Sequence, residues 1–251
     1  MLRINGLTKQ FGGLRVLDEV SFQVPEGIIY GLIGPNGAGK TTLFNLITGI
    51  LKSTAGTVHL GDELLTGLPP HRVTQAGIGR TFQNIRIFRE MTLLENVMVG
   101  MHDHLRYGLA GTLLALPSHR REEKRGQERA RELLSWLSLD TKATVEAGSL
   151  SYGEQRKLEL ARALATEPKV LLIDEPAAGM NPAETEELMG EITCISRRGY
   201  TILLIEHDMR LVMGLCQRIA VLNFGVLIAE GAPAEIRCNS EVVEAYLGKD
   251  V

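Results

Sequence analysis

Hydrophobic and polar positions change their spacing several times along the chain. Near the N-terminus, apolar residues alternate with polar ones in Leu2–Leu7 and Val20–Val24, which is the two-residue period of half-buried strands. Three later runs, Ile28–Ile33, Val170–Ile173 and Thr201–Ile205, are almost wholly apolar, which is typical of strands buried on both faces. We therefore expect an N-terminal antiparallel β subdomain followed by a mainly parallel sheet.

Helical spacing separates the buried strands. Helices are expected over Thr42–Ile50 and Glu154–Thr166, and again over Leu188–Ile195. Near the end of the chain, Arg218–Leu222 and Val226–Glu230 flank a turn and predict a hairpin. Short buried strands that alternate with helices predict an α/β fold, with helices on both faces of the parallel sheet.

The middle of the chain, residues 87–148, has a different character because it lacks a strong strand pattern. Helical spacing appears within Glu122–Leu139, and the small apolar residues of Gly108–Pro117 predict a short helix or loop. We therefore expect one domain of 251 residues, in which a core with its β subdomain (1–86 and 149–251) carries an inserted helical subdomain.

Composition and charge exclude several classes of protein. Hydrophobic residues make up 44% and charged residues 23% of the chain, as in ordinary globular proteins. A formal net charge of −3 argues against a nucleic-acid partner. No apolar run reaches the roughly 18 residues that span a bilayer, and Met1–Gly6 does not resemble a secretory signal. The three cysteines are far apart, which fits a reducing compartment.

The strongest chemical signal is a glycine-rich loop between the buried strand Ile28–Ile33 and a predicted helix. It reads Gly34-Pro35-Asn36-Gly37-Ala38-Gly39-Lys40-Thr41-Thr42 and matches the phosphate-binding pattern of Gly, four residues and Gly-Lys-Thr. Glycines let backbone N–H groups surround phosphate oxygens, and the helix that follows points its positive end at them. We expect Lys40 to reach the β- and γ-phosphates and the Thr41 hydroxyl to ligate Mg²⁺.

Two carboxylates follow the second buried strand, in the sequence Val170–Ile173, Asp174, Glu175. An apolar run that ends in acidic residues is by itself often only a strand that meets solvent. In the same chain as a phosphate-binding loop, however, such residues lie at the sheet edge beside the nucleotide. We expect Asp174 to hold Mg²⁺ through water and Glu175 to act as the general base on the attacking water.

A third motif indicates a family. The segment Leu150-Ser151-Tyr152-Gly153-Glu154-Gln155 resembles the signature of ATP-binding cassette proteins, whose common form is Leu-Ser-Gly-Gly-Gln. Here Tyr152 replaces a glycine and Glu154 is interposed. A serine cap followed by glycine at a helix start is also a reasonable seat for an anion.

The resemblance assigns roles to further residues. Gln83 matches the glutamine loop, which joins the core to the helical subdomain and faces the metal and the reaction centre. His207 matches the switch histidine that contacts the γ-phosphate, and Phe11 matches the aromatic residue that stacks on adenine. One element departs from the pattern, because Asn181 stands where many cassettes have an aspartate.

Other segments resemble a narrower group, the ATPases of branched-chain amino-acid importers, and in particular the first of the two ATPases that such importers use. The segments are Arg80–Gln83, Ile87–Thr92, Pro176–Pro182, Glu206–Met209 and Glu244–Gly248. ATPases of urea import and of lipopolysaccharide export are close relatives and remain open on these motifs.

The resemblance also implies ligands and partners. ATP and Mg²⁺ would bind to Gly34–Thr42 of one cassette, and Ser151 and Gly153 of a second cassette, arranged head to tail, would complete the site. A membrane permease would dock near Gln83, with Ile87 and Phe88 as candidate apolar contacts, and a substrate-binding protein would act indirectly. The protein would then lie at the cytoplasmic face of the membrane as a peripheral subunit.

Two rival classes share some of these features. One is another phosphate-loop enzyme, such as a GTPase or a small-molecule kinase. A GTPase needs an Asn-Lys-x-Asp guanine reader, and the chain contains no Asn-Lys dipeptide. A cassette protein that acts on DNA or ribosomes carries tandem cassettes, long coiled coils or basic surfaces, and the sequence shows none of these.

Overall fold

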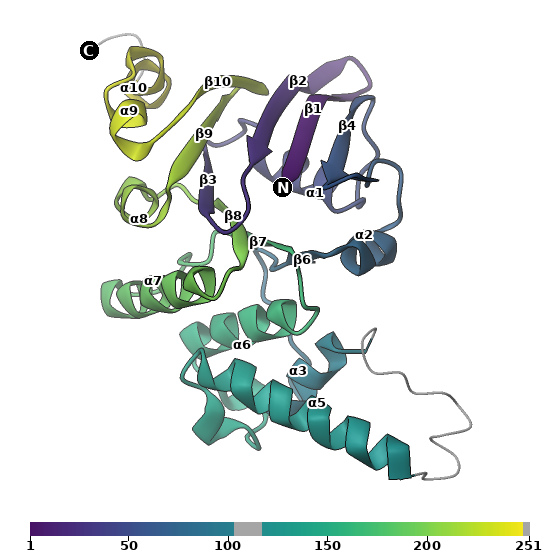
Figure 1. Cartoon of the computed structure of the whole chain (residues 1–251). Helices are drawn as coiled ribbons and strands as arrows, with labels where there is room; N and C mark the ends of the chain where they lie inside the picture. The colour runs from purple at the N-terminus through teal and green to yellow at the C-terminus, as the bar shows by residue number, and fades with distance from the viewer. Residues whose placement is uncertain (103–116, 248–251) are drawn as a thin grey trace. The chain divides into compact units, whose positions relative to one another are not determined.

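The computed structural model describes residues 1–102 and 117–247 (Figure 1). The short element expected at Gly108–Pro117 therefore lies, except for Pro117, outside the described residues. No helix within the described ranges is long and apolar enough to cross a membrane.

The chain folds into two compact units. The first consists of Met1–Arg80, Lys169–Pro176 and the residues from Ser196 onwards. The second consists of Thr81–Pro168 and Ala177–Ile195. The subdomain limits expected from the sequence stay a prediction.

An antiparallel sheet begins the first unit. Its four strands have the order β2-β1-β4-β5 and are β1 (Leu2–Phe11), β2 (Leu14–Val24), β4 (Ala55–Leu60) and β5 (Glu63–Leu64). Both strands expected from the alternating pattern are present and are longer than the pattern indicated.

A six-stranded sheet of order β10-β9-β3-β8-β7-β6 forms the rest of this unit's framework. Its strands are β3 (Ile29–Ile33), β6 (Ile78–Arg80), β7 (Val170–Asp174), β8 (Thr201–Ile205), β9 (Arg218–Asn223) and β10 (Val226–Gly231). All neighbours run parallel except the β9–β10 hairpin. The expected parallel sheet is confirmed, and the carboxyl ends of β3, β7 and β8 lie at one edge of it.

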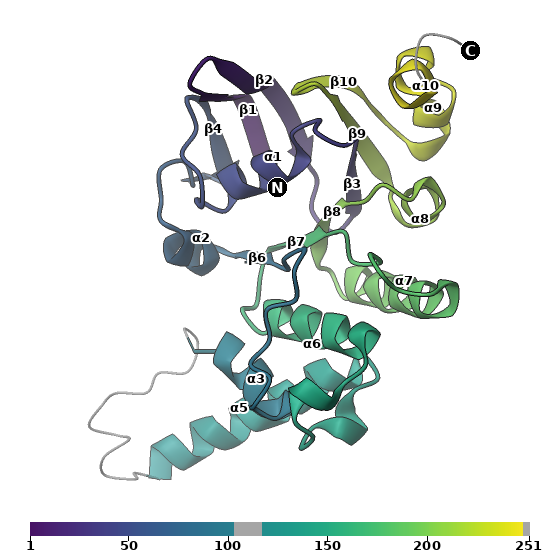
Figure 2. The ribbon, with the colours of Figure 1, turned by 180° about the vertical axis from the view of Figure 1, so that it is seen from behind.

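One hydrophobic core serves both sheets of the first unit. Helix α1 (Lys40–Ile47) contributes Leu43 and Phe44, which are fully buried among residues from both sheets. Tyr30 on β3 stacks on Phe22 of β2 with 5.6 Å between ring centroids. Figure 2 shows α1 beside the N-terminal sheet. The remaining helices are α2 (Pro70–Ala76), α8 (Met209–Leu215), α9 (Pro233–Arg237) and α10 (Ser240–Leu247).

The second unit is helical over its described residues. It contains α3 (Leu93–Gly100), α5 (Pro117–Ser135), α6 (Tyr152–Leu164), most of α7 (Pro182–Arg197) and two short 3-10 turns, Asp140–Lys142 and Ala147–Ser149. The apolar stripe expected on α5 is confirmed, because Ala130, Leu133 and Leu134 are fully buried. Gly100 lets α3 approach α6 closely, since a Cβ there would lie 2.6 Å from the carbonyl oxygen of Arg162.

Candidate functional site

The phosphate-binding loop connects the end of β3 to the start of α1. Lys40, the first residue of α1, is 7% exposed, and its Nζ donates to the carbonyl oxygens of Gly34 (2.6 Å) and Pro35 (3.0 Å). Burial lowers the pKa of Lys40, although the nearby carboxylates of Glu175 and Asp174 oppose that shift. The ammonium group of Lys40 is therefore held against the backbone of the phosphate-binding loop.

Glycine is required at the first position of this loop. Gly34 has φ +153°, and a Cβ there would lie 2.1 Å from the carbonyl oxygen of Leu222 on β9. The hairpin after β9 supports the loop from the same side, because the N–H of Gly225 donates to the carbonyl of Ala38 over 3.0 Å. The loop is thus packed directly against the β9–β10 hairpin.

The two carboxylates lie at the end of β7. Asp174 is 2% exposed, and its Oδ2 accepts from Nη2 of Arg80 over 3.2 Å. Glu175 follows in a left-handed conformation (φ 46°), which turns the chain out of the strand, and its N–H donates to the carbonyl of Ile205 over 3.0 Å. A non-glycine residue in this conformation is strained, and such strain is concentrated at functional sites.

His207 follows β8 and lies beside Glu175. Its Nδ1 is 3.7 Å from Oε1 of Glu175, and its side chain is 60% exposed. The preceding residue, Glu206, is 1% exposed and accepts a hydrogen bond from the His207 backbone N–H over 3.0 Å. The first unit therefore brings Lys40, Asp174, Glu175 and His207 to one edge of the parallel sheet.

The residues of this edge fit a magnesium ion. Thr41 offers a hydroxyl and Asp174 a carboxylate, and hard oxygen donors are what Mg²⁺ prefers. Within the described ranges no group of three or more His, Cys, Asp or Glu residues could hold a metal alone. Magnesium sites of phosphate-transfer enzymes need few protein ligands because phosphate oxygens complete the coordination.

Phe11 lies at the end of β1 and is 46% exposed. Nζ of Lys9 lies 4.6 Å from the centroid of its ring, a cation–π arrangement. The ring of Phe11 is thus accessible from solvent, which a ring that stacks on a base requires.

The signature residues belong to the second unit and begin α6. Ser151 is the N-cap: its hydroxyl accepts from the N–H of Glu154 (3.3 Å), and the Glu154 carboxylate accepts from the N–H of Ser151 (3.1 Å). Lys142 pairs with Glu154, and this hydrogen bond lowers the pKa of the Glu154 carboxyl. Gly153 is buried within the first turn. A reciprocal cap of this kind fixes the helix start at Ser151.

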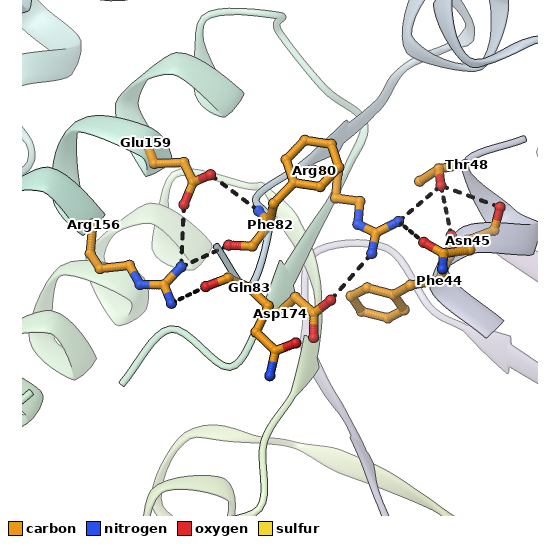
Figure 3. A network of polar contacts seen from close by, with 9 residues as sticks. All are labelled: Phe44, Asn45, Thr48, Arg80, Phe82, Gln83, Arg156, Glu159 and Asp174. Atoms are coloured by element: carbon orange, nitrogen blue, oxygen red, sulfur yellow. Dashed lines mark hydrogen bonds and ion pairs between the residues drawn. The ribbon is translucent and has the colours of Figure 1, made fainter. Parts of the chain in front are cut away.

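Gln83 lies in the second unit, in a segment that α6 fixes by its backbone (Figure 3). Arg156 donates to the carbonyls of Phe82 (2.7 Å) and Gln83, while Oε1 of Glu159 accepts from the N–H groups of Phe82 and Arg86, each over 3.3 Å. Both α6 side chains are buried and pair with each other over 3.4 Å. We call Arg156 and Glu159 the α6 clamp. Burial raises the pKa of Glu159, against the lowering effect of these bonds.

Asn181, the residue that departs from the common cassette pattern, acts as a helix cap. Its Oδ1 accepts from the N–H of Glu184 over 3.0 Å, and Oε2 of Glu184 accepts from the N–H of Asn181 over 3.0 Å. This reciprocal pair starts α7 without requiring a negative charge at position 181.

The sequence reasoning missed three residues of these networks. Arg80, Glu159 and Glu206 are charged residues to which the motifs assigned no role; the fold buries their side chains, and they bond Asp174, the backbone of Phe82 and the backbone of His207, respectively. For Arg80 the only available signal was its position directly before Thr81-Phe82-Gln83.

Comparisons with known proteins identify the family of the chain. The family model described as "ABC transporter" matches residues 17–178, and a second model, "Branched-chain amino acid ATP-binding cassette transporter", matches residues 226–251. The chain therefore belongs to the ABC transporter family of ATP-binding cassettes. The expected family, ATPase class and α/β fold are confirmed.

Individual relatives cover almost the whole chain. The high-affinity branched-chain amino acid transport ATP-binding protein LivG of Salmonella typhimurium is 48% identical over 99% of this chain and 98% of its own length. BraF of Pseudomonas aeruginosa, with the same description, is 45% identical over the same shares. The lipopolysaccharide export system ATP-binding protein LptB of Escherichia coli is 35% identical over 99% and 98%.

Solved structures show the same fold. The ADP conformation of MJ1267, an ATP-binding cassette of an ABC transporter, matches with a TM-score of 0.85 and 34% identity, covering 99% of both chains. The dimeric structure of MJ0796, a bacterial ABC transporter cassette, matches with a TM-score of 0.78 and 26% identity over 93% of this chain and 99% of that one. Nucleotide binding is thus a property of the family to which this chain belongs.

Proposed function

We propose that this chain is the ATP-hydrolysing subunit of a membrane importer for branched-chain amino acids. One observation carries the proposal: the folded first unit gathers Lys40, Asp174, Glu175 and His207 where β3, β7 and β8 end. The match of residues 226–251 to the branched-chain cassette model and the 48% identity to LivG support the choice of substrate class.

The roles follow from chemistry and position. The loop Gly34–Thr42 surrounds the phosphates with backbone N–H groups, and Lys40 exchanges its two carbonyl partners for phosphate oxygens. Glu175 accepts a proton from the attacking water. His207, whose Nδ1 lies 3.7 Å from Oε1 of Glu175, contacts the γ-phosphate. Phe11 stacks on the adenine. Catalysis is then mainly positioning and charge neutralisation.

Thr41 and Asp174 are the residues that would hold Mg²⁺, and the family resemblance adds Gln83. When bound, the ion supplies positive charge that neutralises the phosphate oxygens. The buried carboxylate of Asp174 and the hydroxyl of Thr41 would supply the hard oxygen donors that such an ion prefers.

We further propose that the working site is shared between two cassettes. Ser151 and Gly153 begin α6, and their N–H groups and helix dipole would meet the nucleotide of a head-to-tail partner, a second ATPase subunit. The dimeric structure of MJ0796, a bacterial ABC transporter cassette, supports the proposal that two cassettes associate. Permease subunits at the cytoplasmic face of the membrane would receive the motion of the closing dimer, and a substrate-binding protein would deliver the cargo.

Export of lipopolysaccharide is the second candidate, because LptB is 35% identical over nearly the whole chain. The test is to isolate the tagged chain with its membrane partners and to measure ATP hydrolysis in proteoliposomes. We expect leucine together with its binding protein to stimulate hydrolysis, and urea or lipopolysaccharide to have no effect. The proposed substrate class would be contradicted if lipopolysaccharide alone stimulated ATP hydrolysis. It would also be contradicted if the chain copurified with permeases but no branched-chain amino acid stimulated ATP hydrolysis by that complex.

A further inference from the structure

Arg80 links two elements of the candidate site through buried contacts (Figure 3). It ends β6 and pairs with Leu172 of β7 in the parallel register. Its Nη2 lies 3.2 Å from Oδ2 of Asp174, and the two side chains are 7% and 2% exposed. All of these residues belong to the first unit. The ion pair is therefore a fixed part of that unit's interior.

Helix α1 holds the same guanidinium from the other side. Nη1 of Arg80 donates to Oδ1 of Asn45 over 2.7 Å and to Oγ1 of Thr48 over 3.1 Å. The guanidinium carbon also lies 5.5 Å from the centre of the Phe44 ring. Besides its bond to Asp174, Arg80 is thus held by Phe44 and Asn45 of α1 and by Thr48, the residue that caps the end of this helix.

The contacts with α1 allow Arg80 to orient Asp174. Because α1 already anchors the guanidinium, the guanidinium can hold the Asp174 carboxylate in one orientation. An arginine that only Asp174 held would instead move together with that carboxylate. The guanidinium is planar and presents its N–H groups in a rigid fork, so one plane can serve α1 and Asp174 at once. Helix α1 also begins at Lys40, so Arg80 joins the carboxylate to the helix that starts at the phosphate loop.

Charge makes the pairing necessary. A carboxylate that is 2% exposed is unfavourable unless it is paired and hydrogen-bonded. Lys40 also lies close enough to Asp174 for their charges to interact, but its Nζ is bonded to the loop carbonyls. Arg80 forms a direct ion pair with Asp174 through Oδ2 of the carboxylate.

We propose that Arg80 is a positioning residue for the metal–nucleotide complex: anchored on α1, it sets the orientation in which Asp174 receives the cation. This inference rests on the proposed role of Asp174 as a metal-holding residue. Groups that orient a metal-holding side chain typically change metal affinity by about 10- to 100-fold when they are altered.

The test separates metal-dependent binding from nucleotide binding alone. ADP affinity is measured by calorimetry once with Mg²⁺ and once with EDTA, so that no hydrolysis is involved. Arg80→Lys keeps the charge but loses the fork. We expect the enhancement of ADP affinity by Mg²⁺ to fall by about tenfold, while affinity in EDTA changes by less than about twofold. Arg72→Lys, which alters an exposed arginine of α2, is the matched control and leaves both values unchanged.

Asp174→Asn distinguishes failure of this inference from failure of the proposed function. If Asp174→Asn keeps the full Mg²⁺ enhancement, the metal role of Asp174 is wrong. If Asp174→Asn loses the enhancement but Arg80→Lys keeps or increases it, the positioning role of Arg80 is wrong. In the double variant, Arg80→Lys has no further effect if it acts through Asp174.

If Arg80→Lys does not fold, a second variant tests the positioning role of Arg80. Asn45→Ala removes one anchor of the guanidinium and leaves the Arg80–Asp174 pair in place. We expect a smaller loss of the Mg²⁺ enhancement in the same direction, with unchanged affinity in EDTA. An Asn45→Ala protein with the wild-type enhancement would overturn the proposal.

Discussion

Nδ1 of His207 lies 3.7 Å from Oε1 of Glu175, which brings together the residues that follow β8 and β7. Backbone contacts fix both partners: the N–H of Glu175 donates to Ile205, and the N–H of His207 donates to the buried carboxylate of Glu206. Because those bonds involve main-chain groups, replacing either side chain leaves the two loops in position. The pair can therefore be dissected by mutation without unfolding the site.

His207→Ala should retain nucleotide affinity and lose ATP turnover. The imidazole is 60% exposed, so its removal leaves no buried group unpaired. We expect turnover to fall by about 100-fold, as when a side chain that contacts the developing charge of the transferred phosphate is removed. The measurement is phosphate release at saturating ATP with affinity determined on the same sample. Turnover near the wild-type rate would assign His207 a structural role.

Lys40→Ala should lose nucleotide affinity. The Nζ group is fixed by the carbonyls of Gly34 and Pro35, and its charge-assisted contacts to phosphate are among the stronger hydrogen bonds in proteins. We expect calorimetry to show a weakening of about tenfold or more. Lys52→Ala, an exposed lysine in the same unit, is the control and should bind normally. Wild-type affinity in Lys40→Ala would contradict the phosphate-loop interpretation.

Breaking the α6 clamp should destabilise the second unit. Glu159→Ala leaves the buried guanidinium of Arg156 without its ion-pair partner and two backbone N–H groups without an acceptor. Removing one partner of a buried pair destabilises by about 3–5 kcal/mol, which urea unfolding can detect. Glu128→Ala, whose ion pair with Lys124 is exposed, is the matched control and should unfold like the wild type. Equal stability of the two variants would argue against the clamp.

Thiol chemistry offers a test of the fold itself. Cys216 is buried, and burial raises its pKa to about 12, whereas Cys194 and Cys238 are exposed. Because the thiolate is the reactive form, an aromatic disulfide reagent at neutral pH should titrate two thiols in the native protein and three after denaturation. Three fast-reacting thiols in the native protein would contradict the position of Cys216 beneath Gly31.

The buried strands and the phosphate loop could be predicted because their signals are local. Continuous apolar runs predicted β3, β7 and β8, and the spacing of glycines predicted the loop before α1. A buried strand that ends in a carboxylate delivers it to the sheet edge, so Asp174 was expected beside the nucleotide.

The remaining parts depend on contacts between residues far apart in the sequence. The three-residue strand β6 is too short for a periodic pattern, and β4 alternates only weakly. Nothing local distinguishes Arg80 or Glu159 from surface charges, because their burial arises from packing against α1 and against the Gln83 segment. The cap at Asn181 differs from these, because its signal is local: an Asn followed three residues later by a Glu is a helix-start pattern.

Glu175 takes the proton from the attacking water in the proposed mechanism of this ATP-driven cassette. ATP turnover, ATP affinity and ATP-dependent association are to be measured together on Glu175→Gln and the wild type. Glutamine keeps the shape of the side chain but cannot accept the proton. We expect preserved affinity, turnover reduced by about 100-fold or more, and a stable dimer that forms only with ATP. Unchanged turnover in Glu175→Gln would contradict this mechanism.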